Sequence, residues 1–273
     1  MKMPCFNPSP SRPVLRLQRG WLQFLRWCRR VRGREFQLRV RMLDEWITLD
    51  IQSAKELRRV SNYRKEEALL RRMLAALRQD DTVYDIGANI GIISLIQALH
   101  APGRTCRFHC FEPEPGNCRQ LTRNIALNGL EGRMFPHQLA LGSAEGEIEL
   151  FIRGSSRHST VSSEGSRASI HVPLMTASQF ARTQSCPPVV VKIDVEGAEG
   201  DFLAGMKELM ATSPPREIFL EIHSTGRKDR MPGGETINAW LQGRGYALLW
   251  EQKRSDETHC HYQHKSSGGS DGD

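Results

Sequence analysis

The sequence predicts an α/β protein built on a mostly parallel, doubly wound sheet. Short β-branched apolar runs alternate with helical patterns along the chain, and this order places crossover helices between parallel strands. The clearest unit is Thr82–Leu95 (TVYDIGANIGIISL), where an apolar strand, a glycine turn and an apolar helical pattern follow one another. A chain of 273 residues has room for one such domain and extensions.

The individual elements follow from periodicity and from turn residues. Alternation with a period of two predicts a β-hairpin over residues 36–51. The Ser- and Gly-rich stretch 154–169 has no period and predicts a long loop near a ligand. Apolar or alternating runs predict strands at 82–86, 107–111, 135–141, 147–152, 189–193, 217–222 and 246–250. Helical spacing predicts helices over 66–77, from 92 onward, and over 116–127, 198–210 and 236–241.

Composition divides the chain into four segments. Residues 1–34 form a proline-rich and then basic extension, and residues 35–62 form the hairpin with a connector. Residues 63–252 carry the alternating pattern of the main domain. Residues 253–273 are polar and rich in Gly and Ser, which predicts a disordered tail. No run approaches the roughly 18 consecutive apolar residues of a membrane span.

The positive charge is concentrated at the N-terminus. The net charge is +7, but residues 1–41 contain eleven Lys or Arg and one Glu, so the remainder carries about −3. A basic nucleic-acid-binding body is therefore not favoured. Apolar residues recur at helical spacing over 14–32 and arginines fill the other positions. This basic amphipathic helix fits a membrane surface, an acidic partner, its own domain or an organellar targeting peptide, and the sequence does not separate these readings.

The cysteines and histidines suggest neither a disulfide framework nor a metal site. Seven cysteines occur without a C-x-x-C pair, which is typical of a reducing compartment such as the cytoplasm. The tract His259–His264 (HCHYQH) is the one compositional hint of metal binding. It lies in the predicted tail, which offers no second shell, so we expect no metal.

The glycine turn has the spacing of a nucleoside-cofactor loop. Gly87 and Gly91 form G-x-x-x-G, with Asn89 between them and Asp85 two residues before the first glycine. Dinucleotide enzymes have G-x-G-x-x-G instead, so the spacing disfavours NAD. Glycine allows the turn and a close backbone approach, and the following helix directs free N–H groups at the ligand. We interpret the loop as a site for S-adenosylmethionine, with Asp85 below the amino-acid portion of the cofactor.

An acidic residue at the end of the next strand completes the predicted cofactor site. Glu112 lies 27 residues after Asp85 and is followed by Pro113. At this position in a doubly wound sheet, a carboxylate accepts hydrogen bonds from both ribose hydroxyls.

Two further strand ends carry groups suited to acid–base chemistry. Asp194 and Glu196 follow the strand at 189–193, and Glu221 and His223 lie at the end of the strand at 217–222. Because the carboxyl ends of parallel strands share one edge of the sheet, these residues and the cofactor loop are expected to form one site.

The combined motifs resemble the FkbM-type family of S-adenosylmethionine-dependent methyltransferases from about Tyr63 to Trp250. One departure is Met175–Ser178, where the family often has an Ile/Leu-Asp pair. The matching motifs are VYDIGANIGIISL, FEPEPGN, LTRNIALN, LALGSAEGEIEL, VKIDVEGAEGDFLAGM and LEIH. The resemblance implies a Rossmann-like class I methyltransferase fold and O-methylation of a small-molecule or glycan hydroxyl. It places Asp85, Gly87, Asn89, Gly91, Glu112 and Pro113 at the cofactor, and Asp194, Glu196, Glu221 and His223 at the acceptor.

The expected chemistry is in-line methyl transfer. A sulfonium methyl is already electrophilic, so the protein mainly aligns donor and acceptor and provides a base for the hydroxyl proton. His223 is the leading candidate for that base, because imidazole suits proton transfer near neutral pH, and Glu196 or Glu221 are alternatives. Two other classes remain open: a nucleic-acid methyltransferase recruited by the basic N-terminus, and a non-catalytic protein that binds a partner or a membrane surface.

Overall fold

The computed structural model describes residues 5–6, 36–153, 158–160, 168–223, 230–255 and 257–267. The predicted basic helix over 14–32 lies outside the described residues, so its alternatives stay predictions. In the described part of the chain, no helix is both long enough and apolar enough to cross a bilayer.

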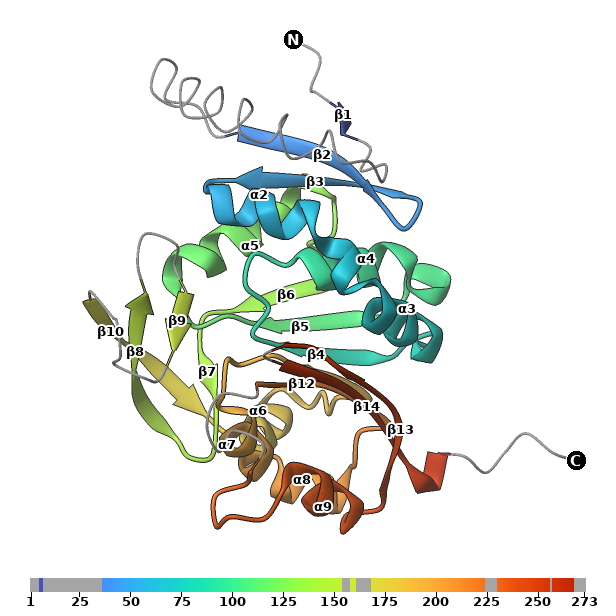
Figure 1. Cartoon of the computed structure of the whole chain (residues 1–273), viewed down its shortest axis with the longest axis vertical. Helices are drawn as coiled ribbons and strands as arrows, with labels where there is room; N and C mark the ends of the chain where they lie inside the picture. The colour runs from blue at the N-terminus through green and yellow to red at the C-terminus, as the bar shows by residue number, and fades with distance from the viewer. Residues whose placement is uncertain are drawn as a thin grey trace, which may run out of the picture.

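A seven-stranded sheet runs through the centre of the described chain (Figure 1), in the order β13-β14-β12-β11-β4-β5-β6. Strands β4, β5, β6, β11 and β12 are mutually parallel, and β14 is antiparallel to both of its neighbours. The predicted mostly parallel, doubly wound α/β fold is confirmed. The strands are β4 (Thr82–Ile86), β5 (Arg107–Phe111), β6 (Met134–His137), β11 (Val190–Ile193), β12 (Glu217–His223), β13 (Tyr246–Lys253) and β14 (Glu257–His264).

Helices cover both faces of this sheet (Figure 1), and the sheet separates two apolar cores. One core joins the sheet to the hairpin and to α3, α4 and α5, and the other joins it to α6, α7, α8 and α9. The helix predicted over 198–210 is two helices that meet at Met206. The helices are α2 (Ala54–Ser61), α3 (Glu67–Ala76), α4 (Ile92–His100), α5 (Pro115–Leu127), α6 (Ala177–Gln184), α7 (Glu199–Gly205), α8 (Lys207–Thr212) and α9 (Ile237–Gln242), with 3₁₀ turns at Tyr63–Lys65, Pro102–Arg104 and Lys265–Ser267.

The predicted hairpin is present as β2 (Phe36–Met42) and β3 (Glu45–Ile51), and the short strand β1 (Cys5–Phe6) pairs with β2. Asn124 of α5 and Asn128, which caps the C-terminal end of α5, attach the hairpin to the domain. The Asn124 side-chain oxygen accepts from the Asp50 N–H at 2.7 Å, and that of Asn128 accepts from the Thr48 N–H at 2.9 Å. The asparagines of the LTRNIALN motif therefore hold the fold together.

A second, four-stranded sheet lies beside the first, in the order β7-β10-β8-β9. Its strands are β7 (Ala140–Leu141), β8 (Gly146–Arg153), β9 (His158–Thr160) and β10 (Ala168–Met175). The prediction of one strand over 135–141 is wrong, because that stretch divides between β6 and β7. The prediction of a loop over 154–169 is wrong where β9 and the start of β10 occur. Serine-rich sequence can still form strands when a neighbouring strand supplies the backbone partners.

The largest correction concerns the predicted disordered tail, because residues 257–264 form β14 inside the central sheet. Cys260 and Tyr262 are buried in the core formed with α9, while the alternate residues His259 and His261 are buried on the other face. The strand was missed because its apolar face consists of only two residues. Its opposite face carries histidines, whose burial depends on partners from other parts of the chain.

Candidate functional site

The predicted cofactor loop follows β4 and is shaped by close contacts with the rest of the protein. Gly87 has φ +80°, and a Cβ there would lie 1.9 Å from the Asp194 carbonyl oxygen. Gly91 has φ +87°, and its Cβ would meet the Leu121 side chain at 2.5 Å. Both glycines are therefore required by backbone conformation and by packing. This loop touches the end of β11, which brings the predicted cofactor loop and the predicted acceptor residues together.

Asp85 lies beneath this loop in a buried ion pair. Its Oδ1 accepts from the Lys192 Nζ at 2.8 Å, and its Oδ2 accepts from the Ser94 hydroxyl in the first turn of α4. Burial lowers the pKa of Lys192, but the nearby carboxylates of Asp85 and Asp194 outweigh this effect and hold it above its ordinary value. Asp85 thus ties β4, β11 and α4 together below the loop. A direct contact with a cofactor stays a prediction.

Glu112 lies at the end of β5 and is almost fully buried, at 4% exposure. Its carboxylate accepts from the Asn89 N–H at 2.9 Å, the Glu114 N–H at 3.0 Å and the Asn117 amide at 3.2 Å. Burial raises its pKa to about 7, although these hydrogen bonds oppose the shift. A carboxylate can accept about four hydrogen bonds, and three of these positions are used here. To accept from both ribose hydroxyls, Glu112 would use the remaining position and would also have to release the Asn89 N–H. Pro113 lies in the turn between Glu112 and Glu114.

Glu114 explains the second acid of the FEPEPGN motif. Its carboxylate caps α5 by accepting from the N–H groups of Gly116 at 3.0 Å and Asn117 at 2.6 Å. Because an N-cap carboxylate satisfies N–H groups that have no helical partner, this residue has a structural role. Glu112 alone is therefore left for a ligand.

His223, at the end of β12, is held by two carboxylates. Its Nδ1 lies 2.9 Å from the Oε1 of Glu199, a fully buried residue at the start of α7, and its Nε2 lies 3.7 Å from the Oε2 of Glu196. Glu196 has φ +53°, which turns the chain between β11 and α7. The hydrogen bond that His223 donates to Glu199 raises the pKa of His223 to about 9, against the effect of burial. A pKa of about 9 makes His223 mainly protonated at neutral pH.

Glu221 belongs to two groups of side chains that could bind a metal ion. The ligand atoms of Asp194, Glu221 and His223 lie within 4.8 Å of one another, and so do those of Glu66, Glu221 and His259. Burial raises the pKa of Glu221 to about 8, and the neighbouring Asp194 adds to the shift. The sequence offered no ligand cluster, whereas the fold assembles these two groups.

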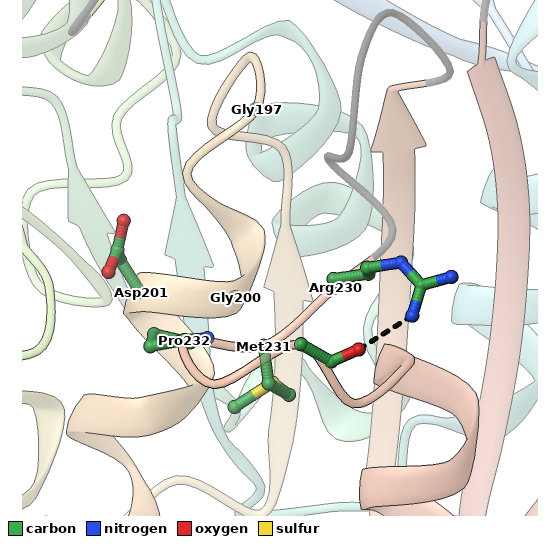
Figure 2. A pocket seen from close by; sticks show the side chains of 7 residues that line it. Gly197, Gly200, Asp201, Arg230, Met231 and Pro232 are labelled. Carbon is green, nitrogen blue, oxygen red and sulfur yellow. Dashed lines mark hydrogen bonds between the residues drawn. The ribbon is translucent and has the colours of Figure 1, made fainter.

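A pocket of about 770 Å³ opens beside the loop that follows Glu196. Gly200, Asp201 and Arg230 line it together with Gly197, Met231, Pro232 and Gly234 (Figure 2). A Cβ on Gly200 would lie 2.3 Å from the Arg230 carbonyl oxygen, so glycine lets this segment lie against α7. The Arg230 Nη1 donates to the Gly234 carbonyl at 2.6 Å, an exposed hydrogen bond that directs the guanidinium away from Asp201 (Figure 2).

The sequence profile of the methyltransferase FkbM domain matches residues 85–248, more than half of the chain. The chain belongs to the FkbM methyltransferase family. The predicted family resemblance is thereby confirmed. The match begins at the end of β4 and includes β5, β11 and β12, so it covers every predicted site residue from Asp85 to His223.

Two curated relatives of this FkbM-family chain act on different acceptors. It is 30% identical over 178 residues to the hexuronic acid methyltransferase AglP of Haloferax volcanii, a match that covers 64% of this chain and 69% of AglP. It is 28% identical over 209 residues to the 31-O-demethyl-FK506 methyltransferase FkbM of Streptomyces tacrolimicus, covering 64% and 76%. A crystal structure of methyltransferase FkbM from Methylobacillus flagellatus KT matches with 15% identity and a TM-score of 0.46, over 70% of this chain and 45% of that chain.

Three residues that bear on the site were missed by sequence reasoning. Lys192 and Glu199 stand at the two ends of the KIDVEGAE run, from which only the inner acids had been singled out. A lysine inside an apolar strand and an acid at a helix start were signals that each needed a partner. His259 was noted only as part of a tail tract, and its partners Glu66 and Glu221 are far from it in the sequence.

Proposed function

We propose that this chain transfers a methyl group from S-adenosylmethionine to a hydroxyl of a sugar or small metabolite. The observation that carries the proposal is the buried Glu199–His223 pair beside Glu196, at the sheet edge that also carries the cofactor loop. A carboxylate on Nδ1 orients an imidazole and strengthens Nε2 as a base. Transfer to an alcohol needs such a base.

The residues at the sheet edge suit the chemistry of the cofactor. S-adenosylmethionine supplies an electrophilic sulfonium methyl. Glu112 is buried, keeps an acceptor position free and lies against Asn89 of the loop, so it suits a ribose. Asp194 and Glu196 place carboxylates at the ends of β11 and β12, where they favour a cationic group such as a sulfonium.

The role of His223 follows from its position and its raised pKa. When bound, S-adenosylmethionine would supply the methyl group, and the residues of this chain would hold the acceptor hydroxyl and receive its proton. The hydroxyl proton passes to His223 Nε2, and Glu199 stabilises the imidazolium through Nδ1. Because His223 has a pKa of about 9, only about 1% of it is neutral at pH 7, so turnover is expected to rise with pH.

The acceptor is proposed to enter through the pocket of Gly200, Asp201 and Arg230. A guanidinium and a carboxylate at the pocket fit a polyhydroxylated or acidic sugar better than an apolar ring. The name of the relative AglP, a hexuronic acid methyltransferase, agrees with this chemistry. We therefore propose a sugar acceptor that bears hydroxyls and, preferentially, a carboxylate.

Two measurements test the proposal. Calorimetry with S-adenosylmethionine measures cofactor binding, and labelled cofactor with paired uronic and neutral sugar conjugates measures methyl transfer as a mass gain of one methylene. His223→Gln is expected to bind cofactor normally and lose turnover at least 100-fold. His171→Gln, on the second sheet, is the matched control for His223→Gln. Arg230→Leu is expected to lose turnover selectively on the uronic conjugate. No cofactor binding by the wild-type chain would overturn the proposal.

A further inference from the structure

His259 is a fully buried histidine whose Nε2 is aimed at three carboxylates at ion-pair distance. Its side chain is 0% exposed, and neither ring nitrogen makes a well-aligned hydrogen bond to a described residue. Its Nε2 lies 3.5 Å from Glu66, 3.4 Å from Glu221 and 3.4 Å from Glu257. A single N–H can serve one acceptor, whereas here three carboxylates stand at nearly equal distance. This arrangement is typical of atoms placed around a common centre.

We propose that Glu66, Glu221 and His259 form a binding site for one divalent metal ion of the Zn²⁺ type. Their ligand atoms lie within 4.8 Å of one another. A tetrahedral zinc ion with bonds of about 2.1 Å separates its ligand atoms by about 3.4 Å. The distances from His259 Nε2 to the oxygens of Glu66 and Glu221, 3.5 and 3.4 Å, match this value. Imidazole with carboxylates also favours a transition metal over Mg²⁺ or Ca²⁺. A water molecule supplies the fourth position.

Three different elements present these ligands. Glu221 on β12 and His259 on β14 are directly paired in the antiparallel ladder, so their side chains stand on the same face of the sheet. Glu66 immediately precedes α3, which packs across the same two strands. A bound ion would therefore connect the start of α3 to β12 and β14.

The surrounding charges support a dication. Arg254 Nη1 holds Glu66 Oε1 at 2.9 Å and Glu257 Oε1 at 2.7 Å, so it neutralises Glu257 and orients Glu66. The other oxygen of Glu66, Oε2, is the one that faces His259. Two carboxylate ligands with a neutral imidazole then balance a charge of +2. Such outer partners orient the ligands of metal sites.

The neighbouring group of Asp194, Glu221 and His223 shares Glu221 with the proposed site. The test must therefore distinguish metal binding at these two groups. His223 Nδ1 is already engaged by Glu199, and this histidine has the proposed proton-transfer role. A His223→Gln variant should keep the ion at the Glu66–Glu221–His259 site. Metal binding by this variant also separates the metal proposal from the proposed methyl transfer, because one can fail without the other.

The experiment uses the full chain, stripped with EDTA and titrated with Zn²⁺ in calorimetry, with Co²⁺ absorption to report coordination geometry. We expect one Zn²⁺ per chain, an intense tetrahedral Co²⁺ spectrum, an increased melting temperature, and weak or absent binding of Mg²⁺. His259→Asn and Glu66→Gln should each weaken Zn²⁺ binding at least 30-fold. Glu66 precedes a helix and is partly exposed, so its variant keeps the fold if His259→Asn does not.

His261→Asn is the matched control, because His261 lies on the same strand face but is paired with Glu217 at 2.9 Å. It should keep the wild-type Zn²⁺ affinity and Co²⁺ spectrum. Binding that is lost equally in His261→Asn would assign the metal to the histidine tract in general and overturn the site. Absence of stoichiometric Zn²⁺ binding by the wild-type chain, or its loss in His223→Gln, would also overturn it.

Discussion

Replacing Lys192 with Met tests whether the buried pair with Asp85 stabilises the cofactor loop. The pair is separated by 2.8 Å, and both side chains are at most 6% exposed. The variant leaves Asp85 buried with the Ser94 hydroxyl as its remaining hydrogen-bond donor. Removing one partner of such a pair costs about 3–5 kcal/mol, because the other charge stays buried without compensation. At about 2–4 °C per kcal/mol for a chain of this size, the melting temperature should fall by about 6–20 °C.

Thermal unfolding followed by circular dichroism measures this loss. Adding Asp85→Asn to Lys192→Met removes the stranded charge and should recover at least half of the lost stability. Lys207→Met, at an exposed position on α8, is the matched control and should change stability by less than about 0.5 kcal/mol. A change below 2 °C in Lys192→Met, or no recovery in the double variant, would refute the reasoning.

Three further outcomes follow from the site. If His223 is the base, turnover of the wild type rises with pH up to about 9. In Glu199→Gln this rise in turnover should be centred nearer pH 6.5. A rise at the same pH as in the wild type would assign the proton to another group. Since the pKa of Glu112 is about 7, cofactor affinity measured by calorimetry should fall as the pH drops below 7, and Glu112→Gln should weaken it and abolish the pH dependence. Gly87→Ala combines a positive φ with a steric clash and should destabilise the chain by more than about 2 kcal/mol in urea unfolding. Gly129→Ala, where a Cβ meets open space, should cost about 1 kcal/mol. Equal losses of stability in the two variants would contradict the clash.

Much of the fold could be predicted because its signals are local. The strand at Thr82–Ile86, the glycine turn after it and the helix from Ile92 each follow from residues within a few positions of one another. Strand β14 could not be predicted in this way. Its histidines are polar in the sequence and become buried only beneath α3 and against β12.

The candidate site shows the same division. Sequence spacing indicated which residues lie at the strand ends, because parallel strands share one edge, and it pointed to Glu112 and His223 in particular. It did not determine their protonation. The pKa of His223 is set by Glu199, which lies 24 positions earlier on another element, and that of Glu112 is set by burial.

The sequence by itself therefore determined the fold class, the family and the positions of the glycine loop and of the acidic strand ends. Only the tertiary structure decided which charges are paired, namely Asp85 with Lys192 and His223 with Glu199. It also decided that a tract read as tail inserts a histidine between Glu66 and Glu221. The physical reason is that electrostatic interactions depend on distance in space and on burial, and neither can be read from separation along the chain.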